Sequence, residues 1–217
     1  MFSVIVIALL GVFAYITIYR TEQSIQPLSK KVSGRIGQLW NAANLGIRDH
    51  KYLRAERALL TILKFDKKNA AAYSRLGMIY ARQKEYKDAI ECFEIASSIH
   101  PGASTLHNLG LIYYETEQYE KAALAFENAL EIENDLAARY IAYAKVQEKL
   151  HHPKIVVEAL ENAVKLEKNK QTINLLMYAY DANDQTEEAD RLRARLAKLV
   201  MPEGKPKRVQ QPRRVIM

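Results

Sequence analysis

The sequence predicts an all-α protein in which one membrane-spanning helix precedes an array of repeated helical units. The 217-residue chain holds only eight Gly and six Pro, too few for a turn-rich all-β fold. Residues 2–19 carry no charged side chain. Farther on, Tyr and Ala recur together at Tyr52, Tyr86 and Tyr119, with spacings of 34 and 33 residues. Self-similarity at such a period is typical of stacked repeats.

Composition and charge exclude several classes of protein. Hydrophobic residues make up 49% of the chain, which is enough for a packed core and excludes a wholly disordered chain. The single cysteine, Cys92, excludes a disulfide framework and a cysteine-based zinc site. The formal net charge is +7, but residues 36–200 hold 23 basic and 23 acidic residues. The positive excess therefore lies in residues 1–35 and 201–217, which indicates a membrane-flanking charge rather than a basic nucleic-acid-binding domain.

Residues 1–20 are predicted to form a transmembrane anchor. The 18 uncharged residues 2–19 would span about 27 Å as a helix, close to the roughly 30 Å of a bilayer core. A cleaved signal peptide is the main alternative. It is disfavoured because no basic residue precedes the apolar stretch and no small-x-small cleavage site follows it.

The basic residues beside this anchor predict the topology. Arg20, Lys30, Lys31 and Arg35 follow the span and no basic residue precedes it. The positive-inside rule then places the N-terminus outside and the body in the cytoplasm, as a single-pass membrane protein. An extracytoplasmic body is the alternative. Residues 21–35 form a juxtamembrane linker, either a short helical extension or a flexible stem.

Two central segments carry the same pattern of key residues. Residues 73–80 read YSRLGMIY and precede Ala89, Phe93, Ala96 and Pro101. Residues 106–113 read LHNLGLIY and precede Ala122, Phe126 and Ala129. This pattern resembles the tetratricopeptide repeat (TPR) family. Weaker copies extend the resemblance over residues 36–200, in units 36–69, 70–102, 103–136, 137–170 and 171–200.

The resemblance implies a solenoid of about five units, each made of two antiparallel helices. Gly77 and Gly110 would let helices approach closely, and large residues such as Phe93 and Phe126 would fill the space between neighbouring helix pairs. Pro153 fits the first turn of a helix. Residues 201–217 contain three prolines and five basic residues, and are predicted to form a basic disordered tail.

In this family the first helices of the units line a concave groove that holds an extended peptide or a partner helix. Carrying the register over gives a candidate partner-binding groove made of Asn44, Arg48, Arg75, Met78, Arg82, His107, Asn108, Leu111, Glu115, Lys145 and Lys149. The Lys, Asn and Arg pattern with which some family members bind a chaperone's C-terminal carboxylate is incomplete here. That class of partner is therefore not expected.

No catalytic motif stands out in the sequence. It contains no GxxxxGK[ST], no GxGxxG and no HExxH stretch. His151 and His152 are adjacent and would point in different directions on a helix, and Cys92 is expected to be a packed, unreactive thiol. We therefore expect no enzymatic activity, no cofactor and no metal site.

The sequence thus predicts a non-catalytic, membrane-anchored TPR scaffold that binds a protein or peptide in its groove and tethers it to the membrane. The lipid contact would be made by residues 2–19 and their basic flanks. The alternative is an extracytoplasmic TPR protein in secretion or envelope assembly. RNA binding through the basic tail is a third hypothesis, weakened because tail charge alone is unspecific.

Overall fold

The computed structural model describes residues 33–200, and their side chains as far as residue 197. The predicted anchor (1–20), most of the predicted linker (21–35) and the predicted tail (201–217) lie outside these residues. Every regular element in residues 33–200 is a helix, which confirms the all-α prediction for this part of the chain. None of the described helices is long and apolar enough to cross a membrane.

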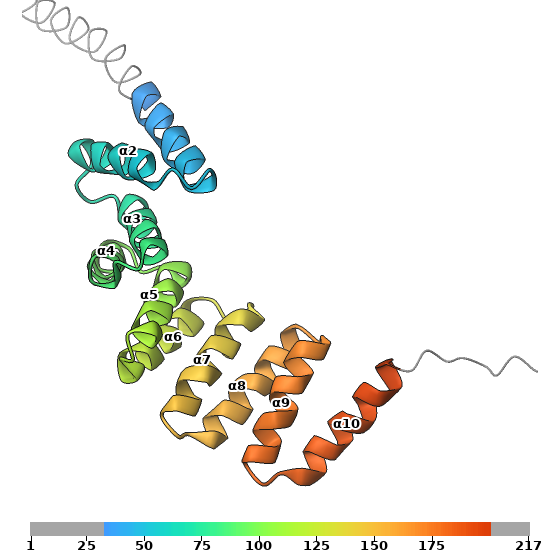
Figure 1. Ribbon diagram of the computed structural model, residues 1–217. Helices are drawn as coiled ribbons and strands as arrows, with labels where there is room; N and C mark the ends of the chain where they lie inside the picture. The colour runs from blue at the N-terminus through green and yellow to red at the C-terminus, as the bar shows by residue number, and fades with distance from the viewer. Residues whose placement is uncertain (1–32, 201–217) are drawn as a thin grey trace, which may run out of the picture. The chain divides into compact units, whose positions relative to one another are not determined.

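The helices follow one another as hairpins of two antiparallel members (Figure 1). Residues 33–48 are helical and precede α2. The remaining helices are α2 (Tyr52–Phe65), α3 (Ala70–Gln83), α4 (Tyr86–Ile99), α5 (Ala103–Glu115), α6 (Tyr119–Ile132), α7 (Ala137–Lys149), α8 (Pro153–Leu166), α9 (Lys170–Ala182) and α10 (Thr186–Val200). The described residues therefore hold five hairpins, the number of units that the sequence predicts.

The chain divides into two compact units, of which the first ends at Pro101 and the second begins at Gly102. Unit 1 contains the helix 33–48 and α2 to α4, and unit 2 contains α5 to α10. In unit 1, Leu59 and Ile62 of α2 pack with Leu76 and Ile79 of α3, all at most 2% exposed. In unit 2, a core cluster joins α7 to α10 around Leu160. Each unit thus buries the apolar faces of several hairpins together.

Two glycines make room for phenylalanine rings within the hairpins. A Cβ atom on Gly77 would lie 2.9 Å from the ring of Phe93, and one on Gly110 would lie 2.9 Å from the ring of Phe126. Both rings are at most 1% exposed. The rings therefore pack inside their own hairpins. This differs from the expectation that they fill the space between neighbouring pairs, because the missing Cβ admits a whole ring between two helices.

The same turn joins the two helices of every described hairpin. Its central residue has a φ of 58–64° in each case: His50, Lys84, Glu117, His151 and Asp184. The next residue donates its backbone N–H to the carbonyl five residues earlier, over 2.8–2.9 Å. This is the hydrogen bond of a Schellman motif, which satisfies a carbonyl at the end of the first helix. The repeated turn fixes how each second helix folds back.

Local sequence explains where several helices begin. Pro153 is the first residue of α8, as predicted, where a missing N–H costs little. Asn69 caps α3 by accepting the N–H of Ala72 over 3.0 Å. Asn169 and Thr172 form a reciprocal capping box at the start of α9.

Candidate functional site

The predicted groove residues fall into both units. Unit 1 holds five of them and unit 2 holds six, so the structure describes them as two separate sets: Asn44, Arg48, Arg75, Met78 and Arg82 in the first, and His107, Asn108, Leu111, Glu115, Lys145 and Lys149 in the second.

In unit 1 the structure brings two of the predicted residues together. Arg75 of α3 donates a hydrogen bond to the side-chain oxygen of Asn44, and its guanidinium lies 4.6 Å from the centre of the Trp40 ring. These contacts join the first helix to α3 and leave Arg75 half-buried. Arg48 lies apart from this pair and is exposed, with Asp49 as its partner over 3.1 Å. Met78 is half-buried and Arg82 is exposed on α3.

In unit 2, His107 contributes to the packing of its hairpin. Its ring meets Phe126 edge-on at a centroid distance of 5.3 Å, and its Nδ1 is buried without a hydrogen-bond partner. Burial, and then the nearby positive charge of Arg139, lower the pKa of His107 below its ordinary value. The imidazole is therefore neutral at physiological pH, and it is poorly suited to bind an anionic partner group.

The other predicted residues of unit 2 lie on two helices. Asn108 is half-buried on α5, where Leu111 and Glu115 are exposed. Lys145 and Lys149 are exposed on α7. Lys145 also borders a hollow in unit 2.

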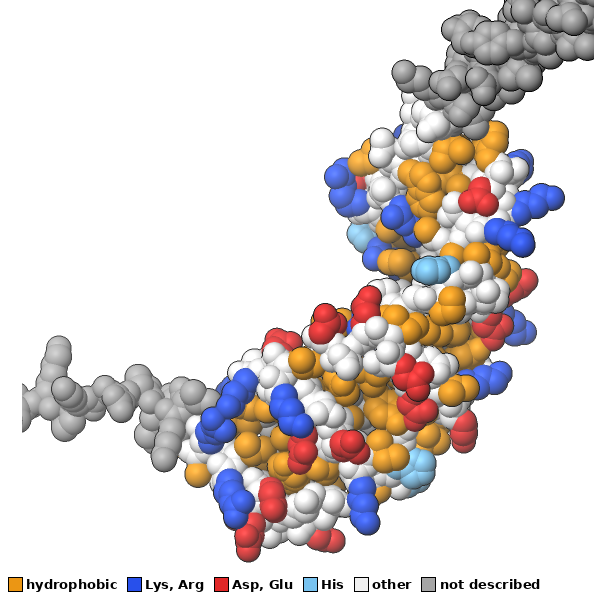
Figure 2. All heavy atoms as spheres, turned by 180° about the vertical axis from the view of Figure 1, so that it is seen from behind, with side chains coloured by type: hydrophobic (Ala, Val, Ile, Leu, Met, Phe, Trp, Pro, Cys, Tyr) orange, Lys and Arg blue, Asp and Glu red, His pale blue; other side chains and the backbone are white. Residues whose placement is uncertain are grey.

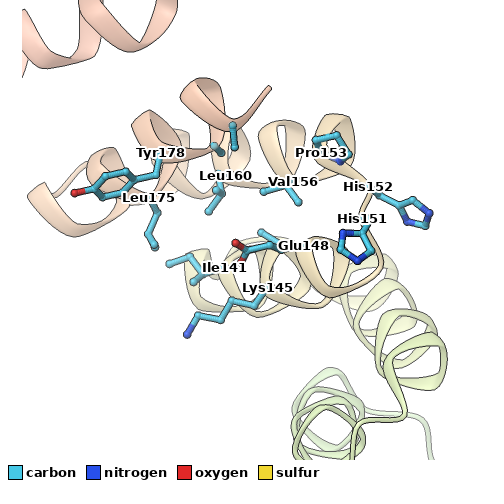
Figure 3. Close-up of a pocket in the computed structure, with 13 residues that line it drawn as sticks. Ile141, Lys145, Glu148, His151, His152, Pro153, Val156, Leu160, Leu175 and Tyr178 are labelled. Atoms are coloured by element: carbon cyan, nitrogen blue, oxygen red, sulfur yellow. The ribbon is translucent and has the colours of Figure 1, made fainter. Parts of the chain in front are cut away.

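That hollow is a cleft of about 440 Å³ between α7, α8 and α9, and we call it the α7–α9 cleft (Figure 3). Its wall is mainly apolar, and charged residues of α7 lie at its edge. The lining residues are Ile141, Ala144, Lys145, Glu148, His151, His152, Pro153, Val156, Leu160, Leu175, Tyr178, Ala179 and Ala182. Ile141 and Leu175 face each other across the cleft, from α7 and α9.

Small residues and one exposed aromatic residue shape this cleft. Ala144 of α7 and Ala179 of α9 have short side chains, which leave space between the facing helices. Tyr178 is 65% exposed although it is a large hydrophobic residue. A ring held at the edge of an apolar cleft, with its hydroxyl in water, can cover a bound chain and offer it a hydrogen bond.

Two tyrosine–glutamate hydrogen bonds fix the helices that frame the cleft. Tyr143 of α7 donates its hydroxyl to Glu127 of α6 over 2.6 Å, and Tyr180 of α9 donates to Glu161 of α8 over 2.7 Å. Burial and the adjacent Glu161 carboxylate raise the pKa of Tyr180 to about 12. Burial and Glu127 likewise raise the pKa of Tyr143. Both hydroxyls therefore stay protonated and remain donors.

Sequence reasoning missed most of this cleft, although the repeat register contained the signal. Lys145 stands at the position that Met78 and Leu111 hold in the preceding units, and the next copy of that position is Tyr178. The predicted set contains no residue of that next unit. Ile141 and Leu175 likewise share their register positions with the predicted residues His107 and Asn108.

The described residues also include one thiol outside the cleft and two adjacent histidines that line it. Cys92 of α4 is half-buried, and burial followed by the carboxylates of Glu91 and Asp88 raises its pKa to about 11. It is therefore a protonated, weakly nucleophilic thiol. His152 precedes α8 and its Nδ1 lies 2.7 Å from Oε1 of Gln147, a structural contact at the turn.

Comparison with known proteins supports the repeat assignment. Residues 68–135 match the tetratricopeptide repeat family. That segment covers α3 to α6, the helices that carry the two copies of the pattern described above. A comparison with curated protein sequences gives no significant match.

Solved TPR structures share the fold over most of the chain. A crystal structure of MamA matches with a TM-score of 0.67 and 18% identity, over 77% of this chain and 97% of that one. MamA from Desulfovibrio magneticus RS-1 matches with a TM-score of 0.67 and 17% identity, over 76% and 94%. YrrB, described as a TPR protein with an unusual peptide-binding site, matches with a TM-score of 0.64 and 18% identity, over 74% and 84%. The chain therefore has a TPR-type fold.

Proposed function

We propose that this protein is a non-catalytic TPR scaffold that binds a protein or peptide segment in the α7–α9 cleft. The observation that carries the proposal is the cleft itself, an apolar hollow of about 440 Å³ within a fold of stacked hairpins. Binding pockets for organic groups typically measure roughly 300–1,000 Å³. This one is therefore large enough for a few side chains of an extended or helical segment.

The lining residues favour a partner with apolar side chains on a polar backbone. Ile141, Val156 and Leu175 offer apolar surface that a partner's side chains would remove from water. Lys145 and Glu148, exposed on α7, can bind carbonyl and N–H groups of the bound chain. Leu111 and Glu115, the exposed predicted residues of α5, extend the proposed surface beyond the cleft.

We further propose that residues 2–19 anchor this scaffold in a membrane, with the repeats in the cytoplasm. The support is the sequence alone: an uncharged 18-residue stretch followed by Arg20, Lys30 and Lys31. The protein would then concentrate its partner at the membrane. A body on the extracytoplasmic side, acting in secretion or envelope assembly, is the second candidate.

Photo-crosslinking tests the proposed partner site. A photoreactive amino acid at Tyr178 in the full-length protein should give covalent adducts with a defined partner in cells. The matched control places the same amino acid at Glu158, an exposed residue of α8 outside the cleft lining. Leu175→Asp should abolish the adducts at position 178. Adducts of equal yield at both positions, or adducts that survive Leu175→Asp, would contradict the site.

Two measurements test the membrane proposal separately. Full-length protein should remain in the membrane fraction after alkaline extraction, and a chain without residues 2–19 should be released. For topology, a cysteine is introduced within residues 201–217 in a Cys92→Ser background. A membrane-impermeant thiol reagent should label it only after the cells are opened. Labelling on intact cells would favour the extracytoplasmic alternative.

A further inference from the structure

The outward face of α2 alternates leucine with basic residues. Four positions with helical spacing i, i+4, i+7 and i+11 lie on one side of the helix, and we call them the α2 stripe: Leu53, Arg57, Leu60 and Lys64. The core residues of α2 lie on the opposite side: Ala55, Ala58, Leu59 and Ile62. The stripe is therefore the part of α2 that points away from the packed interior of unit 1.

The stripe is exposed and lacks negative charge. Leu53 is 61% exposed and Leu60 is 43% exposed, and both basic residues are exposed as well. The single carboxylate of α2, that of Glu56, is half-buried and accepts a hydrogen bond of 2.8 Å from the hydroxyl of Tyr80. Two exposed leucines that alternate with two cations form an amphipathic surface on α2.

The second helices α4, α6 and α8 do not share this pattern at the same register, and α10 repeats its cations, as Arg191 and Lys198, but not its leucines. Each of α4, α6 and α8 carries at least two acidic residues at the four equivalent positions. These positions are Lys87, Glu91, Glu94 and Ser98 on α4, Glu120, Leu124, Glu127 and Glu131 on α6, and Lys154, Glu158, Glu161 and Lys165 on α8. The repeat itself therefore does not require leucines or cations there, and the stripe needs another explanation.

A basic hollow adjoins the stripe at the start of α2. Its volume is about 510 Å³, and its lining combines three cationic side chains with Leu53: His50, Lys51, Tyr52, Leu53, Arg54 and Arg57. On the face that Figure 2 presents, several Lys and Arg side chains lie on the surface of unit 1. The neighbouring hollow, beside Leu60 and Lys64, also contains Asp88 and Glu91 of α4. The basic hollow therefore adjoins the N-terminal half of the stripe, and two carboxylates border its C-terminal half.

We propose that the α2 stripe docks onto the anionic phospholipid surface of a membrane. In this arrangement Leu53 and Leu60 enter the boundary between headgroups and acyl chains, and Arg57 and Lys64 bind lipid phosphates. Arg54 and Lys51 add phosphate contacts from the basic hollow. A nucleic-acid phosphate backbone would satisfy the cations but would leave both leucines exposed to water. A lipid surface matches both kinds of side chain.

This inference rests on the proposed membrane anchoring, which brings the stripe close to lipid. Leu53 follows the end of the predicted span, Tyr19, by 34 residues. Tethering at that separation makes stripe docking an intramolecular event at high effective concentration. The stripe would then hold unit 1 against the bilayer instead of leaving it free in solution.

An environment-sensitive fluorophore on the full-length chain tests the proposal. Leu53→Cys in a Cys92→Ser background is labelled with a nitrobenzoxadiazole dye and reconstituted into vesicles of phosphatidylcholine, with or without phosphatidylglycerol. We expect a blue-shifted, brighter emission in the anionic vesicles and no shift in the neutral ones. Arg54→Gln, Arg57→Gln and Lys64→Gln together should lower the docked-to-free ratio about 100-fold, since each basic residue at an anionic surface contributes roughly fivefold.

The matched control carries the dye at Lys154→Cys, the position of α8 that corresponds to Leu53, and should show no shift in either vesicle. Equal spectra of the Leu53 label in both vesicles would overturn the proposal, as would a shift that survives the triple substitution. A shift that grows with protein density in neutral vesicles would assign the stripe to a second copy, and a shift caused by added RNA would assign it to nucleic acid. Both outcomes overturn lipid docking.

Flotation of the full chain with neutral vesicles reports the anchor independently. If the chain floats and the Leu53 label does not respond to anionic lipid, the anchor is supported and the stripe proposal fails. If the chain fails to float with neutral vesicles, the anchoring proposal fails. Salt-sensitive flotation with anionic vesicles alone would then still support the stripe.

Discussion

Hairpins α5–α6 and α7–α8 follow the same plan but differ in the pair of residues at their centre. In the first, Gly110 faces the ring of Phe126, which is fully buried. In the second, the equivalent residues are Ala144 and Leu160, and Leu160 borders the α7–α9 cleft. Val156 also lines the cleft, at the position where α6 has the fully buried Ala122. The cleft thus adjoins the hairpin that departs from the repeat pattern, whereas the hairpin that keeps the pattern is filled.

This comparison predicts the largest loss of stability for a substitution that removes the central phenylalanine ring. Phe126→Ala should destabilise the protein by about 3–5 kcal/mol, because it leaves a cavity in a fully buried site. Leu160→Ala should cost less, roughly 2 kcal/mol, because a side chain beside an existing cleft leaves less new void. Urea unfolding followed by circular dichroism measures both. A larger loss for Leu160→Ala would contradict the contrast between the two hairpins.

Substitution of the glycine that faces this ring should give the next largest loss of stability. Gly110→Ala should destabilise by about 1–3 kcal/mol, because the new Cβ would lie 2.9–3.0 Å from the ring atoms of Phe126. Gly37→Ala is the control. It lies in the first helix with open space around it, so it should stabilise by roughly 0.5–1 kcal/mol.

Combining two substitutions converts one hairpin centre into the other. Gly110→Ala with Phe126→Leu recreates the alanine–leucine pair found at Ala144 and Leu160. We expect the double variant to be more stable than the two separate losses would predict, by roughly 0.5–3 kcal/mol of coupling. Strict additivity would show that the two positions do not complement each other.

A smaller effect concerns the hydroxyl that fixes the cleft helix α9. Tyr180→Phe removes the hydrogen bond to Glu161 and should cost about 1 kcal/mol. The pKa of Tyr180 is raised to about 12, so its contribution is complete below pH 10 and is lost as the pH rises from 10 toward 12. The difference in unfolding free energy between wild type and variant should therefore shrink over that range. Tyr178→Phe, which removes the hydroxyl of an exposed ring, is the control for the loss of a tyrosine hydroxyl as such.

The smallest effect is expected from His107 in the filled hairpin. Its pKa is lowered in the folded protein by burial and by Arg139, so the unfolded chain binds its proton first as the pH falls. Stability should therefore decrease as the pH drops through about 6.5, the ordinary histidine pKa. His107→Gln should weaken this decrease relative to wild type. Parallel pH profiles for wild type and His107→Gln would contradict the assignment.

The hairpins were predictable from the sequence because they depend on local, repeated features. The period of 33 or 34 residues, the buried alanines Ala89 and Ala122, and Pro153 at the start of α8 all follow from patterns that short segments carry. The phenylalanine positions were recognised, but which surface each ring contacts was not. That outcome depends on the room left by a glycine on the partner helix.

The sequence predicts which repeat positions contribute to the candidate site, but not the shape of the site. Lys145 was found because it repeats a known position, but the depth of the cleft arises from the combined shapes of Ile141, Leu160 and Leu175 on three helices. Side chains that share a register position also have different partners. Arg75 contacts Asn44 and Trp40, and His107 is half-buried against Phe126, and the register position alone indicates neither contact.

The turn that recurs in every described hairpin has a consequence for engineering. Its central residue adopts a left-handed backbone, which costs a non-glycine residue about 1–2 kcal/mol, yet none of the five is glycine. Lys84, Glu117 and Asp184 line neither the α7–α9 cleft nor the basic hollow. Replacing these three with glycine should relieve that cost, by up to about 1 kcal/mol each after the added chain entropy is counted. These three substitutions should therefore raise the thermostability of the protein without altering either proposed binding surface.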